Sequence, residues 1–235
     1  DPQITTVLFD LDGTLLPMEL EKFTNTYFGL LAKKAAPFGF QPEPLVAAVW
    51  KGTKAMVKND GTETNDKRFW DTFAGEMGEE VLQLRPVFDG FYANEFHGAK
   101  AACGENPLAR RAIDGLKAKG YDVILATNPI FPLVGVETRL SWVGLRPEDF
   151  SYITAYENST TCKPNPAYYA EILRKTGKRP QECLMVGNDA TEDTAALEQG
   201  IGVYLVTDCL LNPKGRDISG VPQGTFAAFL EFAGV

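Results

Sequence analysis

Short apolar segments alternate with amphipathic segments along the second half of the chain, and this pattern limits the fold most. The expected strands are residues 121–127, 150–155, 183–187 and 201–207. The expected helices are residues 107–120, 132–144, 165–177, 190–200 and 222–234. Strands that are apolar on both faces and separated by helices indicate βαβ units. We therefore predict an α/β fold, a Rossmann-like parallel sheet with helices on both faces.

The segment VLFD at residues 7–10 has the same apolar character but is far from the other expected strands. No comparable strand occurs between it and residue 121, and residues 17–95 have the spacing of amphipathic helices. We predict two domains. Residues 1–16 and 96–235 form the α/β core, and residues 17–95 form a mainly helical cap inserted after the first strand.

Charge and hydropathy exclude several classes of partner. The net charge of −8 argues against binding of a nucleic acid polymer, which requires a basic surface. No stretch approaches the roughly 18 apolar residues of a membrane span. The first residues lack the features of a signal peptide, so we expect a cytoplasmic protein. Nothing in the sequence indicates a protein partner.

Two carboxylates stand where the first strand ends, Asp10 and Asp12 in VLFDLDGTL. Ligands of open parallel sheets bind at the carboxyl ends of the strands, and side chains two residues apart can point to the same side. Two adjacent carboxylates repel each other, and Mg²⁺ relieves that cost. One carboxylate is then free to act as nucleophile and the other as proton shuttle. The alternative is an ordinary turn in which Asp caps the backbone.

VLFDLDGTL resembles the first motif of the haloacid dehalogenase superfamily, in which most members are phosphatases or phosphomutases that form an aspartyl-phosphate. The second family motif is Thr or Ser at a strand end, which Thr127 matches, with Asn128 after it. The third is a lysine before a helix, which Lys163 matches in TCKPNP. The resemblance covers residues 4–16 and 107–207, and it implies a phosphatase-type member with a helical cap between the first two motifs.

The fourth motif is an acidic cluster after a strand, and LMVGNDATED departs from its commonest form because Asn188 follows the glycine. Two registers fit. Either Asp189 is the metal ligand and Asp193 the supporting acid, or Asn188 occupies the ligand position with a neutral oxygen. We prefer Asp189, because an anionic ligand suits a hard cation. Asp193 also fits a structural role as an acid in the first turn of a helix.

The resemblance implies the following roles. The catalytic residues are Asp10 as nucleophile, Asp12 as proton shuttle, Thr127 and Lys163. The phosphate ligands are Thr127, Asn128 and Lys163. The Mg²⁺ ligands are Asp10, the backbone carbonyl of Asp12, and Asp189.

The implied substrate is a small phosphorylated metabolite, cleaved as a phosphate monoester. Asp12 argues against dehalogenation, because a halide leaves without a proton. A sugar-phosphate mutase with the same core chemistry is one alternative. A non-catalytic protein that binds a phosphorylated ligand is another, and Asn188 gives it some support.

The cap sequence says little about chemistry. Lys51, Lys54 and Lys58 lie close to one helical face, where they could meet an anionic substrate, but we expect a solvated basic face. The aromatic cluster at 69–73 is expected to form cap core rather than a platform for base stacking. His97 is expected to have a structural role.

Overall fold

The computed structural model describes residues 3–235. The strands within them are β1 (Thr6–Phe9), β2 (Asp122–Leu125), β3 (Tyr152–Ile153), β4 (Cys183–Gly187), β5 (Gly202–Val206) and β6 (Gln223–Gly224). They form one parallel sheet in the order β3-β2-β1-β4-β5-β6. β1 therefore lies in the middle, with Phe9 in register with Leu125 of β2 and Val186 of β4. The predicted α/β fold is confirmed.

Helices cover both faces of this sheet because every residue of β1 is buried and neighbouring side chains point to opposite faces. The core helices are α5 (Leu108–Ala118), α6 (Leu133–Ser141), α7 (Pro166–Thr176) and α8 (Phe226–Ala233). Phe9 belongs to one hydrophobic cluster with residues of α5 and α8. Leu8 belongs to a second cluster with residues of α7. The short 3₁₀ helices of the core are η4 (Pro147–Asp149), η5 (Pro180–Glu182) and η6 (Thr194–Gln199).

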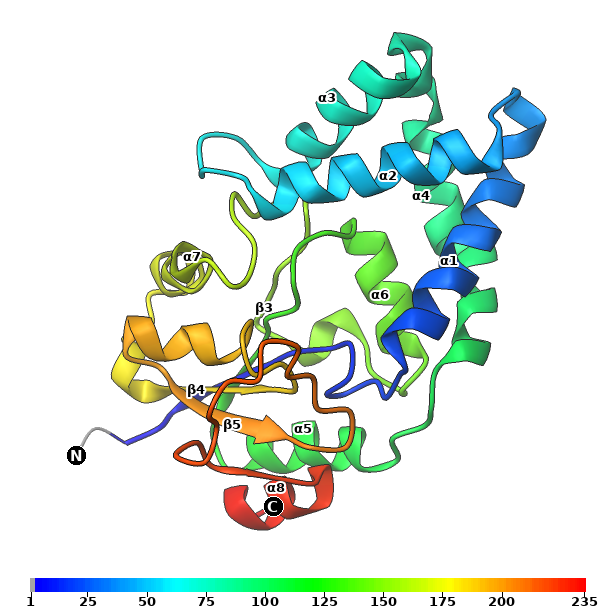
Figure 1. Ribbon diagram of the computed structural model, residues 1–235. Coiled ribbons are helices and arrows are strands. Elements are labelled where there is room, and N and C mark those ends of the chain that lie inside the picture. The colour runs from blue at the N-terminus through cyan, green and yellow to red at the C-terminus, as the bar shows by residue number, and fades with distance from the viewer. Residues whose placement is uncertain (1–2) are drawn as a thin grey trace.

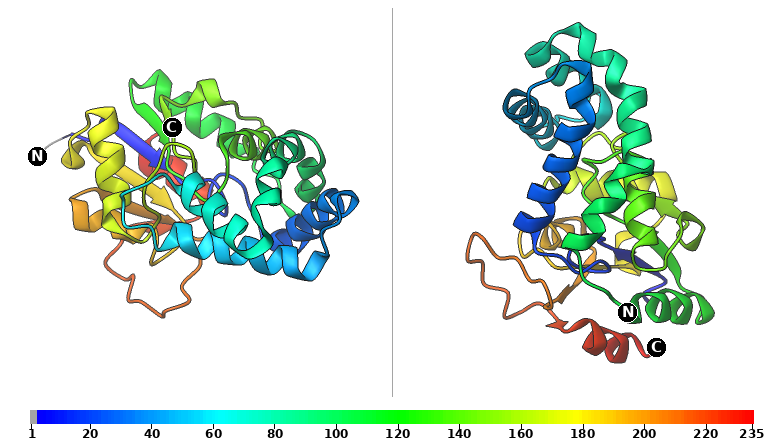
Figure 2. Two further views of the ribbon diagram at one scale, coloured as in Figure 1. Left: turned by 90° about the horizontal axis from the view of Figure 1, so that it is seen from above. Right: turned by 90° about the vertical axis from the view of Figure 1, so that its right-hand side faces the viewer.

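The chain between β1 and β2 is helical. Its elements are α1 (Leu20–Ala35), η1 (Ala36–Phe38), α2 (Pro42–Val57), α3 (Asn65–Met77), η2 (Glu79–Leu84), α4 (Arg85–Ala93) and η3 (Glu95–Ala102). In α1 the residues Phe23, Tyr27 and Leu31 repeat at helical spacing and are buried, so this face packs inward. Figures 1 and 2 show α1 to α4 grouped together on one side of the sheet. The boundaries of the cap at residues 17 and 95 stay a prediction.

None of the helices within residues 3–235 combines the length and the apolar character needed to cross a bilayer.

The helix expected at 190–200 is shorter and tighter than predicted, since only η6 forms there. Asp189 Oδ1 accepts hydrogen bonds from the backbone N–H groups of Thr191 and Glu192, both at 2.8 Å. The Asp193 N–H donates to the carbonyl of Asp189. These bonds hold residues 190–193 in turns, and regular helical structure starts only at Thr194.

A tight turn after Asp12 brings the first motif against the loop that follows β4. Gly13 has φ +86°, a conformation that favours glycine. A Cβ at this position would lie 2.1 Å from Nδ2 of Asn188, so no other residue fits without displacing that side chain. The glycine thus places two segments that are far apart in the sequence side by side at one end of the sheet.

Candidate active site

A buried lysine joins carboxylates from two strand ends. Nζ of Lys163 lies 3.2 Å from Oδ1 of Asp10 and 2.8 Å from Oδ1 of Asp193. Asp10 directly follows β1 and donates its backbone N–H to the carbonyl of Val186 in β4. Lys163 is 1% exposed, and it precedes Asn165, whose side chain caps α7 by accepting the Ala167 N–H. The motif lysine is therefore held in the sheet edge rather than on a free surface.

The charges of this group depend on one another. Burial lowers the pKa of Lys163, but the attraction of Asp10 and Asp193 outweighs it and raises that pKa well above its usual value. Burial raises the pKa of the Asp10 carboxyl, and Lys163 opposes this rise. Lys163 is therefore a permanent cation at neutral pH, and its charge is shared between the two carboxylates.

Thr127 and Asn128 lie at the end of β2, beside this cluster. The Thr127 carbonyl accepts hydrogen bonds from the hydroxyls of Thr154 and Tyr168, at 2.6 and 2.9 Å. Oδ1 of Asn128 accepts the backbone N–H of Lys163 at 3.0 Å. Both residues line the same cavity as Asp10. These bonds fix the loop after β2 to the lysine loop.

Asp12 points into the cavity and is paired with a residue that the sequence analysis missed. Nε of Arg139, in α6, donates to Oδ1 of Asp12 at 2.9 Å. Arg139 is fully buried, and its guanidinium lies 4.3 Å from the centre of the Phe131 ring. An arginine three residues after Val136, on the buried side of a helix, is the signal that could have found it.

The loop after β4 presents Asn188 and Asp189 differently. The Asn188 amide is engaged at both ends, because Oδ1 accepts the Thr14 hydroxyl and Nδ2 donates to the carbonyl of Cys209. Asp189 uses only Oδ1 to hold its own turn. Both residues line the cavity. Asp193 instead turns inward, where Oδ2 accepts the N–H groups of Asn188 and Asp189.

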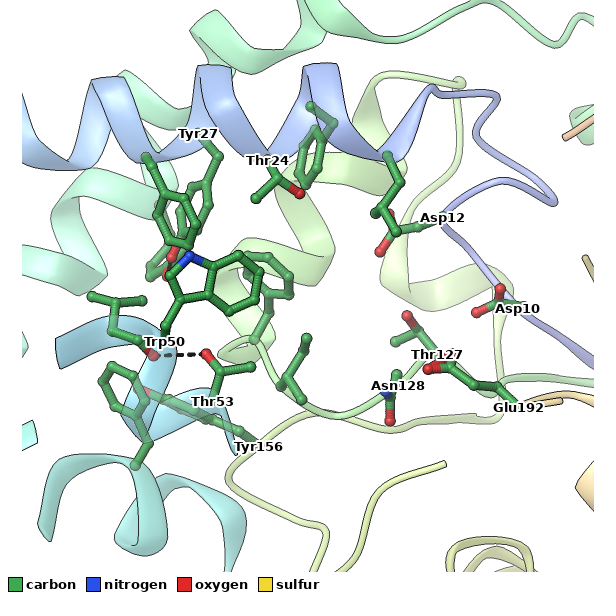
Figure 3. Close-up of a pocket in the computed structure, with 18 of the residues that line it drawn as sticks. Asp10, Asp12, Thr24, Tyr27, Trp50, Thr53, Thr127, Asn128, Tyr156 and Glu192 are labelled. Atoms are coloured by element: carbon green, nitrogen blue, oxygen red, sulfur yellow. Dashed lines mark hydrogen bonds between the residues drawn. The ribbon is translucent and has the colours of Figure 1, made fainter. Parts of the chain in front are cut away.

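A further carboxylate, Glu192, was also missed. It lines the cavity with Asp10, Asp12 and Asp189, and Figure 3 shows its side chain pointing inward. Burial raises the pKa of Glu192 to about 7, and Lys163 opposes the rise. No sequence pattern singles out Glu192, because it immediately precedes Asp193 in an acidic run and resembles a solvated residue of a helix.

The cavity has a volume of about 270 Å³ and lies between the strand ends and the helices inserted after β1. Its strand-end side is formed by the polar residues Asp10, Asp12, Thr127, Asn128, Asn188, Asp189 and Glu192. Its opposite side is mainly aromatic, with Phe23, Tyr27, Phe28, Trp50, Phe69, Trp70, Phe88, Tyr92, Phe131 and Tyr156. Figure 3 shows Asp10 and Asp12 on one side and Tyr27 and Trp50 on the other.

Several candidates from the cap lie outside this cavity. Lys51, Lys54 and Lys58 are exposed and do not line it, and Lys51 pairs with Glu76 at 2.9 Å. Nδ1 of His97 accepts the indole N–H of Trp142 at 3.1 Å, which is a structural contact. In the aromatic cluster at 69–73, Phe69, Trp70 and Phe73 are buried as expected, and the first two also line the cavity.

The geometry agrees with the similarity of the whole chain to known proteins. A model of haloacid dehalogenase-like hydrolases matches residues 4–200. The chain belongs to that family. Phosphoglycolate phosphatase from Shigella dysenteriae is 25% identical over 205 residues, which are 83% of this chain and 77% of the relative. The predicted phosphatase-type membership is confirmed, because the curated relatives are named as phosphatases.

Solved structures share the fold across nearly the whole chain. A HAD phosphatase from Thermococcus onnurineus has a TM-score of 0.62 and 16% identity, covering 98% of both chains. A 2-haloacid dehalogenase from Pseudomonas syringae has a TM-score of 0.61 and 18% identity, covering 99% of both. Phosphatases and dehalogenases therefore share this architecture, and the site residues must distinguish between them.

Proposed function

We propose that the protein is a Mg²⁺-dependent phosphohydrolase that cleaves a small phosphate monoester through an aspartyl-phosphate on Asp10. The observation that carries this proposal is the position of Asp10 and Asp12 at one end of the cavity, with Lys163 bound to Asp10 at 3.2 Å. A phosphatase needs a nucleophile, a proton donor for the leaving alcohol and a cation for the phosphate, and these three residues supply them. Thr127 and Asn128 stand beside them to hold the phosphate oxygens.

The donor atoms fit Mg²⁺. Asp10 and Asp189 each have a carboxylate oxygen, Oδ2, that accepts no hydrogen bond from any residue among 3–235. Within those residues no group of three or more His, Cys, Asp or Glu side chains forms a metal cluster. Two carboxylates, the Asp12 carbonyl and water are the kind of ligand set that Mg²⁺ uses, together with substrate phosphate. The ion would neutralise charge on the phosphoryl group.

The residues act in two steps. First, the Asp10 carboxylate attacks phosphorus, the bond from phosphorus to the ester oxygen breaks, and Asp12 gives the leaving alkoxide a proton. Asp12 then takes a proton from water, which attacks the aspartyl-phosphate and releases inorganic phosphate and free Asp10. Lys163 balances the charge of Asp10 and of the phosphoryl oxygens throughout.

Asp12 distinguishes this chemistry from dehalogenation. A departing halide needs no proton, whereas an alkoxide does, so a carboxylate that can donate a proton into the cavity favours an ester substrate. The pairing of Asp12 with Arg139 keeps this carboxylate on the cavity side.

The test is the Asp10→Asn variant, assayed for release of inorganic phosphate from phenyl phosphate with Mg²⁺. Loss of a nucleophile should lower kcat by about four orders of magnitude or more while the fold stays intact. Acid quenching of the wild-type reaction should trap phosphate on the peptide that contains Asp10. Asp114→Asn, at an exposed position of α5, is the control and should keep full activity.

Three outcomes would contradict the proposed phosphohydrolase mechanism. Retained turnover in Asp10→Asn would refute the nucleophile assignment. Transfer of phosphate to sugar hydroxyls without release would indicate a phosphomutase. Binding of phosphorylated ligands with no turnover at all would indicate the non-catalytic alternative.

A further inference from the structure

The cavity wall opposite the strand ends is built from rings that belong to different helices. Trp50 of α2 packs edge to face on Phe28 of α1, with 5.2 Å between the ring centres. Trp70 of α3 packs on Phe88 of α4 at 5.3 Å. All four rings line the cavity. The part of a ligand that extends away from the phosphate site therefore meets aromatic surface from four helices.

This wall carries no positive charge. Of the described residues that line the cavity, none is a lysine, an arginine or a histidine. Arg85 lies 5.8 Å from the centre of the Trp70 ring, but its guanidinium is bonded to Asp66 at 2.6 Å and it does not line the cavity. Lys163 and Arg139 lie near the strand ends and do not line the cavity. Lys163 is bound to Asp10, and Arg139 is bound to Asp12 through Nε, while its Nη2 is buried without a hydrogen-bond partner.

The polar groups inside the wall are neutral hydroxyls. Tyr27 and Tyr92 share one hydrogen bond between their hydroxyl groups, which leaves one of the two hydrogens free to donate. The Tyr156 hydroxyl accepts the indole N–H of Trp70 at 3.3 Å, so its own hydrogen is also free. Burial raises the pKa of all three tyrosines, which keeps them uncharged at neutral pH. They can bind a hydroxyl or a carbonyl but offer no counter-charge.

Building on the proposed phosphohydrolase activity, we infer that the preferred substrate is the phosphate monoester of an uncharged alcohol with an aromatic ring and no second anionic group. The phosphate would lie at Asp10 and Lys163, and the ring would pack between Trp50, Phe28 and Trp70. A cavity of about 270 Å³ is at the small end for ligand sites, and this favours one ring system over a nucleotide.

A second anionic group is excluded by charge. A carboxylate at the aromatic wall would lose its water and find no cation, and burial of an unpaired charge is strongly unfavourable. By this reasoning phosphoglycolate, the substrate named for the Shigella relative, is a poor substrate here.

The test compares kcat/KM for benzyl phosphate, para-carboxybenzyl phosphate, butyl phosphate and phosphoglycolate with Mg²⁺. The first two differ by one carboxylate on the same ring, so their comparison isolates the charge. Benzyl phosphate should exceed para-carboxybenzyl phosphate and phosphoglycolate by about tenfold or more, and butyl phosphate by a smaller factor. The ring contributes apolar contacts that butyl only partly replaces.

A positive charge introduced into the wall makes the test specific. Trp50 is 52% exposed at the cavity edge, so Trp50→Arg is tolerated sterically and places a cation where the ring was. The ratio of benzyl to para-carboxybenzyl turnover should fall by about tenfold in this variant. Phe38→Arg is the matched control, because Phe38 is 53% exposed but lies outside the cavity, and the ratio should stay unchanged.

The outcomes separate this inference from the proposed function. Faster turnover of phosphoglycolate or para-carboxybenzyl phosphate than of benzyl phosphate would overturn the substrate class and leave the phosphohydrolase intact. An unchanged ratio in Trp50→Arg would also overturn it. No turnover of any of the four esters would refute the phosphohydrolase itself, and the substrate class with it.

Discussion

The two sides of the cavity differ in charge: the strand-end side carries charged residues, and the cap side is neutral. At the strand ends, charge is concentrated and paired, with Lys163 between Asp10 and Asp193 and with Arg139 on Asp12. On the cap side, the lining residues are aromatic rings and neutral hydroxyls. The first arrangement provides reactive groups at fixed positions, and the second provides shape and a dry surface. The reactive groups therefore come from the strand ends, and most of the aromatic surface comes from the helices inserted after β1.

The two sides also depend on each other. Apolar walls lower the local dielectric constant, so each ion pair at the strand ends is stronger than it would be in water. The same burial raises the pKa of Glu192 to about 7. The aromatic side contributes no charge of its own, but it encloses the charged groups at the strand ends.

The largest effect on this comparison is expected from Lys163→Met, which removes the central cation but keeps most of the length of the side chain. Asp10 and Asp193 would then share a buried site without a counter-ion. The free energy of unfolding at pH 7 without Mg²⁺ should fall by about 3–5 kcal/mol, measured by urea denaturation. Turnover should be lost as well.

The control is Lys178→Met, which removes a partly exposed pair with Asp122 at 3.0 Å and should cost less than about 1 kcal/mol. The pH dependence adds a second criterion. Burial raises the pKa of Asp10, and loss of Lys163 removes the group that opposes this rise. The Asp10 carboxyl should bind a proton more readily in the variant than in the wild type, so the stability deficit should shrink as the pH is lowered. A deficit that grows at low pH would contradict the pairing.

The next largest effect is expected in the loop after β4, where Asp189→Ala and Asn188→Ala separate the two motif registers. Removal of an anionic ligand should raise the Mg²⁺ concentration for half-maximal activity about 10–100-fold. Asn188→Ala should raise it far less, because that amide is engaged by Thr14 and Cys209. The reverse ranking would make Asn188 the ligand and contradict our preference.

The strands and motifs of the core could be predicted from the sequence, because their patterns are local. The aromatic wall of the cavity could be predicted only in part. Strands such as β4 are apolar throughout because a parallel sheet is covered on both faces, and that pattern is local. Asp10, Asp12 and Lys163 also lie in short motifs at element ends. The helix predicted at 190–200 forms only in part, as the 3₁₀ helix η6, because residues 190–193 form turns on the side chain of Asp189, which periodicity does not reveal.

The roles of Arg139 and of the aromatic wall could not be predicted from local patterns. The role of Arg139 depends on a partner 127 positions away, Asp12. Phe69 and Trp70 were assigned correctly to the cap core, but their second surface faces the cavity. Contacts of this kind join distant segments, so no spacing within one segment predicts them.

A moderate effect is expected from Arg139→Gln, which tests whether the pair with Asp12 matters for catalysis. The shorter, neutral side chain would leave the Asp12 carboxylate unanchored. A misplacement of about 1 Å costs on the order of 100-fold, so kcat should fall by about 10–100-fold while KM changes by less than about threefold. Steady-state kinetics with benzyl phosphate and excess Mg²⁺ measure this.

Arg111→Gln, at an exposed position of α5, is the control for Arg139→Gln and should leave both constants unchanged. An Arg139 variant with normal kcat would show that the pair is structural only. A rise in KM without a fall in kcat would instead place Arg139 in substrate binding.

The smallest effect is expected from Lys51→Ala, on the outer side of the cap. Its partner Glu76 is also solvated, and such exposed pairs contribute about 0–1 kcal/mol. Because Lys51 does not line the cavity, kcat/KM should change by less than about twofold for both benzyl phosphate and para-carboxybenzyl phosphate. Equal results at low and high salt would show that the cap lysines do not attract the substrate. A selective loss of the carboxylated ester would mean that anionic substrates are bound through the cap surface, and the contrast between a charged core and a neutral cap would fail.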